Sequence, residues 1–405
     1  MKRLITALLI VVAVVFSSCT LTPQISNDKK SRLNGIWISF TELNFDDKTK
    51  SGFKSRFDNM MRDVSQKGFN AVFVHIRPRA DAFYKSDIFP FSEFASGEQG
   101  KNPGYDPMEI MIDSAHRNNL QFHAWINPFR VAPSTDLNKL SSNNIAKKWL
   151  SDDDKSNDEY VLEVNGGLWF NPSVKRVREL VVSGVCEIVE NYDVDGVHMD
   201  DYFYPSTDKS IDKTQYSEYC KENKNPLKLY DFRRSCINDM VKNIYNAVKK
   251  TNESILFGIS PQANMDNNYD SLYADVKCWC QNTGYIDYIA PQVYFGFEYK
   301  YVTKSGQKMQ FESCVDYFIN LVTNNDISLY IGLGMYKSGT KASDIFDSEN
   351  EWINHSDIIA RQIECISEKE RVSGFIIFSY TSMTQNATAK RETINMIDAI
   401  KKVKK

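Results

Sequence analysis

The sequence predicts an α/β fold, a (β/α)8 TIM barrel with long loops at the C-terminal face of its strands. Apolar strand-like runs alternate with amphipathic segments along the chain, which is typical of parallel α/β folds. Polar and aromatic residues follow several of these runs, at the strand end where parallel barrels carry their sites. The chain beyond its first 30 residues, about 375 residues, is long enough for one barrel with insertions.

Eight segments are expected to be the strands, and they are residues 36–40, 71–76, 120–126, 194–199, 255–260, 285–294, 328–333 and 373–379. Amphipathic helices are expected between them at residues 53–67, 107–118, 174–192 and 229–249. Gly or Asn ends several of these helices, as at Gly68 and Asn119. The connections after strands three, four and six are long, at residues 127–168, 202–227 and 295–310, so substrate recognition is expected there. No compositional break divides residues 31–401, which are expected to form a single domain.

Residues 1–19 have the pattern of a lipoprotein signal peptide. Lys2 and Arg3 precede an apolar run at residues 4–16 that is too short to span a bilayer. Ser17 and Ser18 stand directly before Cys19, an arrangement that resembles the lipobox of bacterial lipoproteins and implies cleavage before Cys19 and a lipid on it. A plain secretory signal with a chance cysteine is the alternative. We expect residues 20–30 to be a flexible tether and Cys19 to anchor the exported protein to the cell envelope, at the outer membrane if the source has two membranes.

The composition of the chain limits the classes of partner that it is expected to bind. The formal net charge of −3 argues against a nucleic-acid partner, which calls for a basic surface. Aromatic residues make up 13% of the chain, an excess that is compatible with sugar binding. Cys278 and Cys280 offer only two possible ligands without a neighbouring His, so no zinc site is expected there. No metal or other cofactor is expected.

Residues 195–205 carry the strongest chemical signal. Alternation along the fourth strand directs His198 and Asp200 into the barrel, with the intervening apolar residues toward the helices. Cleavage of a sugar polymer needs two carboxyl groups, one to protonate the leaving oxygen and one to attack or stabilise the anomeric carbon. We expect Asp200 to be the central carboxylate, with Asp201 or Glu298 as its partner and Asp201 preferred. Alternatively, Asp201 caps the next segment or holds one of the arginines Arg77, Arg79 and Arg130.

Polar residues on the inward faces of the other strands complete the expected substrate site. Inward polar groups at a barrel mouth are costly unless they meet a partner or a ligand. The candidate binding residues are Trp37, His75, Arg77, Asp81, His123, Trp125, Asn127, His198, Tyr202, Gln292 and Tyr294. Each one alone is also compatible with a satisfied buried polar group. Five strands that end in this way favour a cleft lined by amides, hydroxyls and indoles.

Five motifs in order carry a resemblance to a known family. They are Gly35-Ile36-Trp37, the segment His75 to Tyr84, the segment His123 to Arg130, Leu168-Trp169-Phe170-Asn171-Pro172, and the segment Asp195 to Pro205. Over most of the mature chain they resemble the glycosyl-hydrolase-like family ten domain of bacterial lipoproteins. The resemblance implies a TIM barrel and a glycosidase that cleaves peptidoglycan glycan strands stripped of their peptides.

The fourth-strand motif also resembles the chitinase signature, in which spaced aspartates lead to a catalytic Glu. Here Tyr202 occupies the Glu position, and a phenol does not easily replace that acid at neutral pH. Asp200 is therefore the best remaining acid.

The sequence thus predicts a lipid-anchored glycoside hydrolase that acts on an envelope or extracellular polysaccharide. Two other hypotheses fit the same residues. One is a glycan-binding lipoprotein that retains the barrel without the chemistry. The other is a metal-dependent deacetylase or amidase of the same fold that uses His75, His123 and His198 with Asp200.

Overall fold

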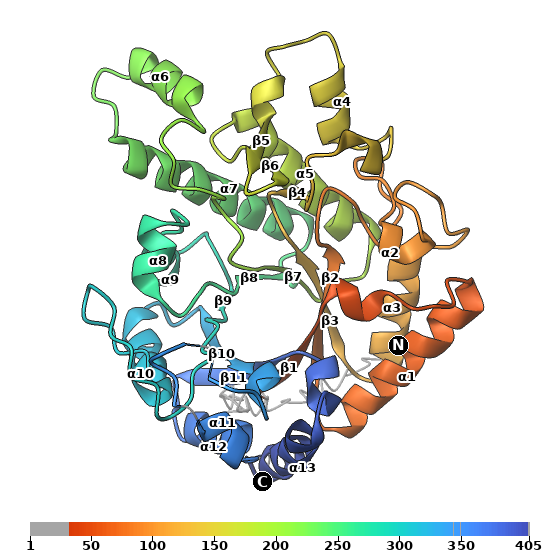
Figure 1. The fold of residues 1–405 in the computed structure, drawn as a ribbon, viewed down its shortest axis with the longest axis vertical. Helices are drawn as coiled ribbons and strands as arrows, with labels where there is room; N and C mark the ends of the chain where they lie inside the picture. The colour runs from red at the N-terminus through yellow and green to blue at the C-terminus, as the bar shows by residue number, and fades with distance from the viewer. Residues whose placement is uncertain (1–31, 343, 349, 404–405) are drawn as a thin grey trace, which may run out of the picture. The chain divides into compact units, whose positions relative to one another are not determined.

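Eight parallel strands close into a barrel in the computed structural model, which describes residues 32–342, 344–348 and 350–403. The strands follow one another around the barrel in the order β1, β11, β10, β9, β8, β7, β3, β2 (Figure 1). Their bounds are β1 Leu33–Ile38, β2 Ala71–Arg77, β3 Gln121–Ile126, β7 Gly196–Met199, β8 Leu256–Ile259, β9 Tyr288–Ile289, β10 Ser328–Gly334 and β11 Val372–Phe378. The predicted (β/α)8 fold is confirmed.

Each expected strand segment overlaps a barrel strand, and two of the strands differ most from their expected extent. β1 begins three residues before its expected start, at Leu33. β9 has only two residues, although isolated parallel bridges at Gln292 continue its contacts to Gln262 and Gly332. Pro291 interrupts the hydrogen-bonding pattern that continues from β9, because proline has no backbone N–H to donate to a neighbouring strand.

A long helix follows each barrel strand except β8, and Figure 1 shows these helices around the strands. They are α1 Lys50–Gln66, α3 Pro107–Arg117, α5 Lys175–Asn191, α7 Leu229–Thr251, α10 Phe311–Leu321, α12 Ile358–Ser367 and α13 Ala387–Val403. Further helices, most of them shorter, lie in the connections at α2 Glu93–Ser96, α4 Ile145–Ser151, α6 Lys213–Glu222, α8 Met265–Asp270, α9 Val276–Gln281 and α11 Glu351–Asn354. Within the described ranges, no helix is both long and apolar enough to cross a bilayer. Cys19 and the expected signal and tether lie outside the described residues.

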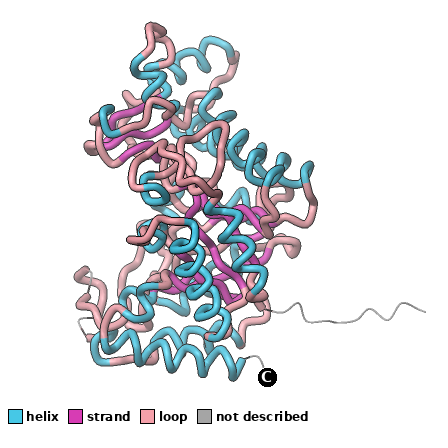
Figure 2. The backbone as a smooth tube through the Cα atoms, turned by 90° about the vertical axis from the view of Figure 1, so that its right-hand side faces the viewer, coloured by secondary structure: helices cyan, strands magenta, loops and turns pink. Residues whose placement is uncertain are grey.

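The long connection after β3 contains a small antiparallel sheet that the sequence prediction missed. Its strands, β4 Arg130–Ala132, β5 Val161–Val164 and β6 Gly167–Phe170, pair in the order β4, β6, β5. Asn165 and Gly166 both have positive φ, the conformation of the tight turn that joins β5 to β6. Figure 2 shows this sheet apart from the barrel strands. The small sheet holds the two ends of this connection, at Arg130 and Phe170, together beside the barrel mouth.

Aromatic rings fill the barrel interior, and two glycines make room for them. The ring of Tyr288 lies against Gly258 in β8, and the ring of His123 lies against Gly196 in β7. A Cβ at either glycine would overlap the neighbouring ring, so close packing requires glycine there. The interior cluster consists of Leu33, Trp37, Ala71, Phe73, Trp125, Tyr288, Ala290, Tyr330 and Ile376. Below its mouth the barrel is a packed core, which leaves the strand ends as the place for a site.

Candidate active site

Asp200 directly follows β7 and lies at the floor of the barrel mouth. The indole N–H of Trp125 donates a hydrogen bond to its Oδ2 at 3.0 Å. Its Oδ1 accepts a bond from the backbone N–H of Tyr202 at 3.3 Å and lies 3.5 Å from Nδ2 of Asn127. Asp200 is only 3% exposed. The structure therefore brings together the inward residues of β3 and β7 that alternation along the strands predicts.

The surroundings of Asp200 favour its protonated form. Burial, followed by the negative charge of Asp201, raises the pKa of Asp200 to about 8. The hydrogen bonds from Tyr202 and Trp125 and the charge of Arg130 act in the opposite direction but do not outweigh burial. A carboxyl with this pKa is largely protonated at pH 7 and can donate a proton.

Asp201 is held by two amides at the ends of neighbouring strands. Gln262, after β8, donates to its Oδ2 at 2.8 Å, and Gln292, after β9, donates to its Oδ1 at 3.1 Å. Gln292 also donates to the backbone carbonyl of Ser260 at 2.9 Å, which fixes the direction of its amide. Among the described residues, the side chain of Asp201 neither caps the next segment nor pairs with an arginine. The sequence prediction missed Gln262, which lies beyond the end of its expected strand.

Arg130 and two aromatic rings form one wall beside Asp200. The guanidinium carbon of Arg130 lies 5.0 Å from the ring centroid of Tyr202 and 5.8 Å from that of Trp169. Trp169 pairs with Arg130 across the small sheet, and its ring is 6.2 Å from that of Tyr202. Tyr202 is 42% exposed, so this wall is open to solvent. Sequence reasoning did not include Arg130 or Trp169 among the site residues, although both lie in motifs that carry the family resemblance.

His75 and Tyr294 extend the site on other sides. The imidazole of His75 stacks on the indole of Trp125 with centroids 3.7 Å apart. Neither ring nitrogen of His75 has a hydrogen-bond partner within the part of the chain that the structure describes. Burial, together with the charge of Arg130, lowers the pKa of His75 well below its ordinary value, so the ring is neutral. Tyr294 lies close enough to Asp201 and Asp200 for their charges to raise its pKa, in addition to the larger effect of burial.

Comparison with known proteins decides the family. The model of the family described as glycosyl hydrolase-like 10 matches residues 32–353. This chain belongs to the glycosyl hydrolase-like 10 family. The resemblance that its five sequence motifs indicate is thereby confirmed.

Two glycosyl hydrolases can be aligned with this glycosyl hydrolase-like 10 chain over most of its length. Glycosyl hydrolase YngK of Bacillus subtilis is 34% identical over 398 residues, 92% of this chain and 73% of that protein. Glycosyl hydrolase DigH of Escherichia coli K12 is 27% identical over 428 residues, 92% and 91% of the two chains. The glycoside hydrolase domain of PgaB (BpsB) from Bordetella bronchiseptica has the same fold, with a TM-score of 0.60 and 8% identity over 90% of this chain and 99% of that domain. Family and fold together support a glycoside hydrolase.

Two expected binding residues of the glycosyl hydrolase-like 10 barrel, His123 and His198, are fully buried below the mouth. Trp37 donates from Nε1 to Nε2 of His198 at 3.1 Å, so Nδ1 of His198 carries the proton and donates to the hydroxyl of Tyr288 at 3.1 Å. That hydroxyl donates to Nδ1 of His123 at 3.3 Å, and Nε2 of His123 donates to Gln121 at 3.4 Å. In this chain of hydrogen bonds each imidazole accepts at one nitrogen and must therefore be neutral. Burial lowers the pKa of both histidines and so favours the neutral form. These residues, with Trp37, support the floor of the site from below.

The same bonds bear on the metal-dependent hypothesis. Both ring nitrogens of His198 and of His123 already have hydrogen-bond partners, and His75 stacks on Trp125 instead of turning toward them. Across the described ranges, no group of three or more His, Cys, Asp or Glu side chains is placed to hold a metal ion. The histidines do not converge in the way that this hypothesis needs.

Arg77 does not face the barrel interior, and the prediction that it lines the cleft is wrong. The pairing of β2 with β3 shifts register between His75 and Arg77, so regular alternation ends before Arg77. Its guanidinium is buried over the ring of Phe89 at 4.6 Å and against Gly184 of α5, where a Cβ has no room. Arg77 therefore packs between the barrel and α5.

Asp81 and Glu298 also lie apart from Asp200. Asp81 is fully buried in the connection after β2, where its Oδ2 accepts a bond from Gln99 at 3.1 Å. Burial raises the pKa of Asp81 to about 6. Glu298 is exposed, and its backbone N–H donates to the buried carboxylate of Glu351 at 3.3 Å. Neither residue shares a hydrogen bond with Asp200, which leaves Asp201 as the neighbouring carboxylate.

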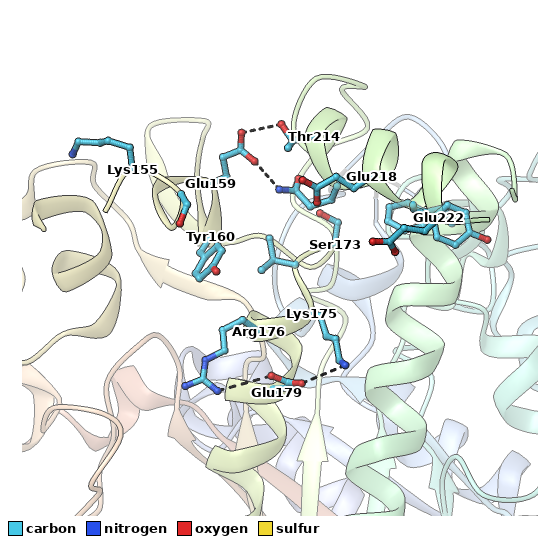
Figure 3. A pocket seen from close by; sticks show the side chains of 15 residues that line it. Lys155, Glu159, Tyr160, Ser173, Lys175, Arg176, Glu179, Thr214, Glu218 and Glu222 are labelled. Atoms are coloured by element: carbon cyan, nitrogen blue, oxygen red, sulfur yellow. Dashed lines mark hydrogen bonds and ion pairs between the residues drawn. The ribbon is translucent and has the colours of Figure 1, made fainter. Parts of the chain in front are cut away.

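An open groove of about 710 Å³ lies between α6, the start of α5 and the segment before β5. The carboxylate of Glu159 crosses it and accepts hydrogen bonds from Thr214 at 2.8 Å and Gln215 at 2.7 Å (Figure 3). On its α5 side, Glu179 forms ion pairs with Lys175 and Arg176. None of the residues that contact Asp200 lines this groove, so it is separate from the candidate active site.

Proposed function

We propose that this protein is a glycoside hydrolase in which Asp200 donates a proton to the leaving oxygen of a glycosidic bond. The observation that carries the proposal is a buried carboxyl with a pKa of about 8 at the C-terminal end of a barrel strand. Glycosidases need a carboxylic acid that stays protonated near neutral pH, and burial beside a second carboxylate provides it. Family membership supports the same reaction class.

Asp201 is the second carboxylate of the proposal. As the leaving oxygen takes a proton, positive charge develops on the anomeric carbon and ring oxygen, and a nearby carboxylate stabilises that charge or attacks the carbon. Gln262 and Gln292 each donate a hydrogen bond to Asp201, which fixes its position without a positive charge that would compete with the sugar. The two neighbouring aspartates therefore have separate roles because their environments differ.

The substrate we propose is a polysaccharide, the glycan strand of peptidoglycan. Trp169, Tyr202 and Tyr294 offer ring faces and hydroxyls suited to sugar rings. The choice of peptidoglycan rests on the family resemblance.

Reducing ends released from four polymers test the substrate: peptide-free glycan strands, peptide-bearing strands, chitin and an unrelated glucan. We expect the peptide-free strands to be cleaved fastest. Faster cleavage of chitin or the glucan would contradict the substrate. Binding of strands by a folded protein that cleaves none of them would favour the glycan-binding hypothesis instead.

Trp125→Phe tests the role of the indole that contacts Asp200. The phenyl ring keeps an aromatic face against His75 but removes the hydrogen bond that lowers the pKa of Asp200. The pKa of Asp200 should rise, and the alkaline limb of kcat/KM, which reports its deprotonation, should move to higher pH. We expect kcat/KM at pH 7 to fall by a factor of about 2 to 10, because one hydrogen bond to the acid is lost.

The matched control is Trp279→Phe, which removes an indole hydrogen bond to Asn238 on the helical side of the barrel. Its pH profile should match that of the parent. An unchanged alkaline limb in Trp125→Phe would contradict the assignment of that limb to Asp200.

We also propose export and lipid anchoring through Cys19, which follows a short apolar run and two serines. The full chain, expressed in a bacterial host with radiolabelled palmitate, should incorporate label and fractionate with membranes. Cys19→Ser should lose the label, whereas Cys220→Ser, which alters a cysteine of α6, should retain it. Label in neither the parent nor Cys220→Ser would contradict the anchor without bearing on the enzyme activity.

A further inference from the structure

Arg130 is fixed beside the proposed acid by its own backbone. Its N–H donates to Oδ1 of Asn127 at 3.1 Å, and Nδ2 of Asn127 faces Asp200 at 3.5 Å. The same asparagine thus joins the two residues. The backbone of Arg130 is also held by the pairing of β4 with β6, in which Arg130 lies opposite Trp169. The position of Arg130 relative to Asp200 is set by secondary structure and not by a flexible loop.

The guanidinium of Arg130 makes no direct ion pair in the part of the chain that the structure describes. Within residues 32–342, 344–348 and 350–403, no carboxylate oxygen lies within 4.0 Å of it, and no hydrogen bond from its side chain is found. Arg79, the other arginine near this side of the mouth, pairs with Glu93 at 2.9 Å. Among the described residues, Arg130 is therefore a positive charge at the site without a carboxylate in direct contact.

The contacts of Arg130 leave its hydrogen-bonding edge available. Trp169 and Tyr202 lie near the guanidinium and offer it their ring faces. Neither ring accepts a conventional hydrogen bond from the guanidinium, whose N–H fork fits a carboxylate with two parallel hydrogen bonds. His75 is 3% exposed, has no partner for either ring nitrogen among the described residues, and lies close enough for the charge of Arg130 to lower its pKa. A buried polar ring in this state needs a ligand or water.

We propose that Arg130 binds a carboxylate carried by the sugar at or next to the bond that is cleaved, so the enzyme selects acidic glycans. This inference rests on the proposed glycosidase function and specifies its substrate. The carboxylate has two chemical sources, the lactyl ether of a peptide-free amino sugar or the C6 carboxylate of a uronic acid. In peptide-bearing strands the lactyl carboxylate is consumed in an amide bond, so this contact would be lost.

The test compares substrates that differ only in this charge. Peptide-free strands are used as they are or after conversion of their carboxylates to primary amides, and a polyuronide is treated in the same two ways. The parent should cleave the acidic form of one polymer with a kcat/KM about tenfold to a hundredfold above that of the amide, as expected for a charge-assisted contact. The polymer that shows this ratio identifies the source.

Variants at Arg130 separate binding from a general effect on Asp200. Arg130→Gln should lower kcat/KM for the acidic form and bring the ratio of acidic to amide substrate near one. Arg130→Lys should retain part of that ratio, because it keeps the charge without the fork. Arg79→Gln is the matched control and should leave the ratio unchanged. A loss of rate that is equal for both substrate forms, with a shifted pH profile, would overturn the inference in favour of electrostatic tuning of Asp200.

Failure of the proposed function gives a different result. If the parent cleaves neither form, calorimetric titration of both forms still tests Arg130. Tighter binding of the acidic form that Arg130→Gln abolishes would support the carboxylate contact, and equal binding of the two forms would overturn it.

Discussion

Asp200→Asn is expected to lower kcat on glycan strands by a factor of about 10² to 10⁴, the range that general acid catalysis contributes. The amide keeps the shape of the side chain and a partner for Trp125 but cannot supply a proton to the leaving oxygen. The loss should be much smaller on an aryl glycoside of the same sugar whose leaving group departs without protonation. Rates on both substrate types, for the parent and the variant, distinguish a proton donor from a nucleophile. An equal loss on both would contradict the role of donor.

Folding of the Asp200→Asn variant is the control for this result. The pKa of Asp200 is about 8 in the folded protein and about 3.9 in an unfolded chain. Between these values the unfolded chain ionises while the folded protein stays protonated, so the contribution of Asp200 to stability falls as pH rises through this window. Asparagine lacks this penalty. The variant should therefore be at least as stable as the parent at pH 7, with a smaller difference near pH 4, as thermal unfolding at both pH values would show.

Arg233→Met is expected to lower the free energy of unfolding by about 3 to 5 kcal/mol, because it leaves a buried carboxylate without its partner. Arg233 and Asp212 are both fully buried, with Nε to Oδ2 at 2.7 Å and Nη2 to Oδ1 at 2.6 Å. Arg233 also donates to the hydroxyl of Tyr273 at 3.0 Å and to the carbonyl of Thr207 at 3.2 Å. These bonds attach the connection that follows Asp200 to helix α7. Urea unfolding curves of the parent and the variant measure the effect.

The neighbouring residue provides the matched control for this prediction. Arg234 pairs with Asp231 at 2.7 Å, where the carboxylate is 46% exposed, and donates to the carbonyl of Tyr269 at 2.9 Å, so Arg234→Met should cost only about 1 to 2 kcal/mol. A double variant, Arg233→Met with Asp212→Leu, should recover much of the loss because no unpaired charge remains. Equal losses for Arg233→Met and Arg234→Met would show that the buried pair does not hold this connection.

The strand alternation that predicted the floor of the site works where strands are regular. His198 lies in β7 and Asp200 directly follows it without a register shift, so their inward positions follow from the period of two. Arg77 fails the same rule because the register shift after His75 turns it outward. A bulge of one residue has no distinctive composition here, so the sequence did not reveal it.

The wall beside Asp200 depends on pairing that a single strand pattern does not encode. Arg130 reaches the site because β4 pairs with β6. These two strands are about 35 residues apart in the sequence and are only three and four residues long. Such short strands inside a long connection resemble loop sequence. The Asn165-Gly166 pair, a hairpin signal, was the available clue to the sheet. Gln262 escaped notice because it lies beyond the expected end of its strand, and its amide reaches Asp201 through the pairing of β7 with β8.

Release of new reducing ends from peptide-free peptidoglycan strands, by the chain from Ser31 onward and by its Asp200→Asn form, tests the central claim most directly. The account predicts products from the parent and at least about a hundredfold slower release by the folded variant. Equal rates for the two proteins, or binding of strands by the parent without any cleavage, would contradict it.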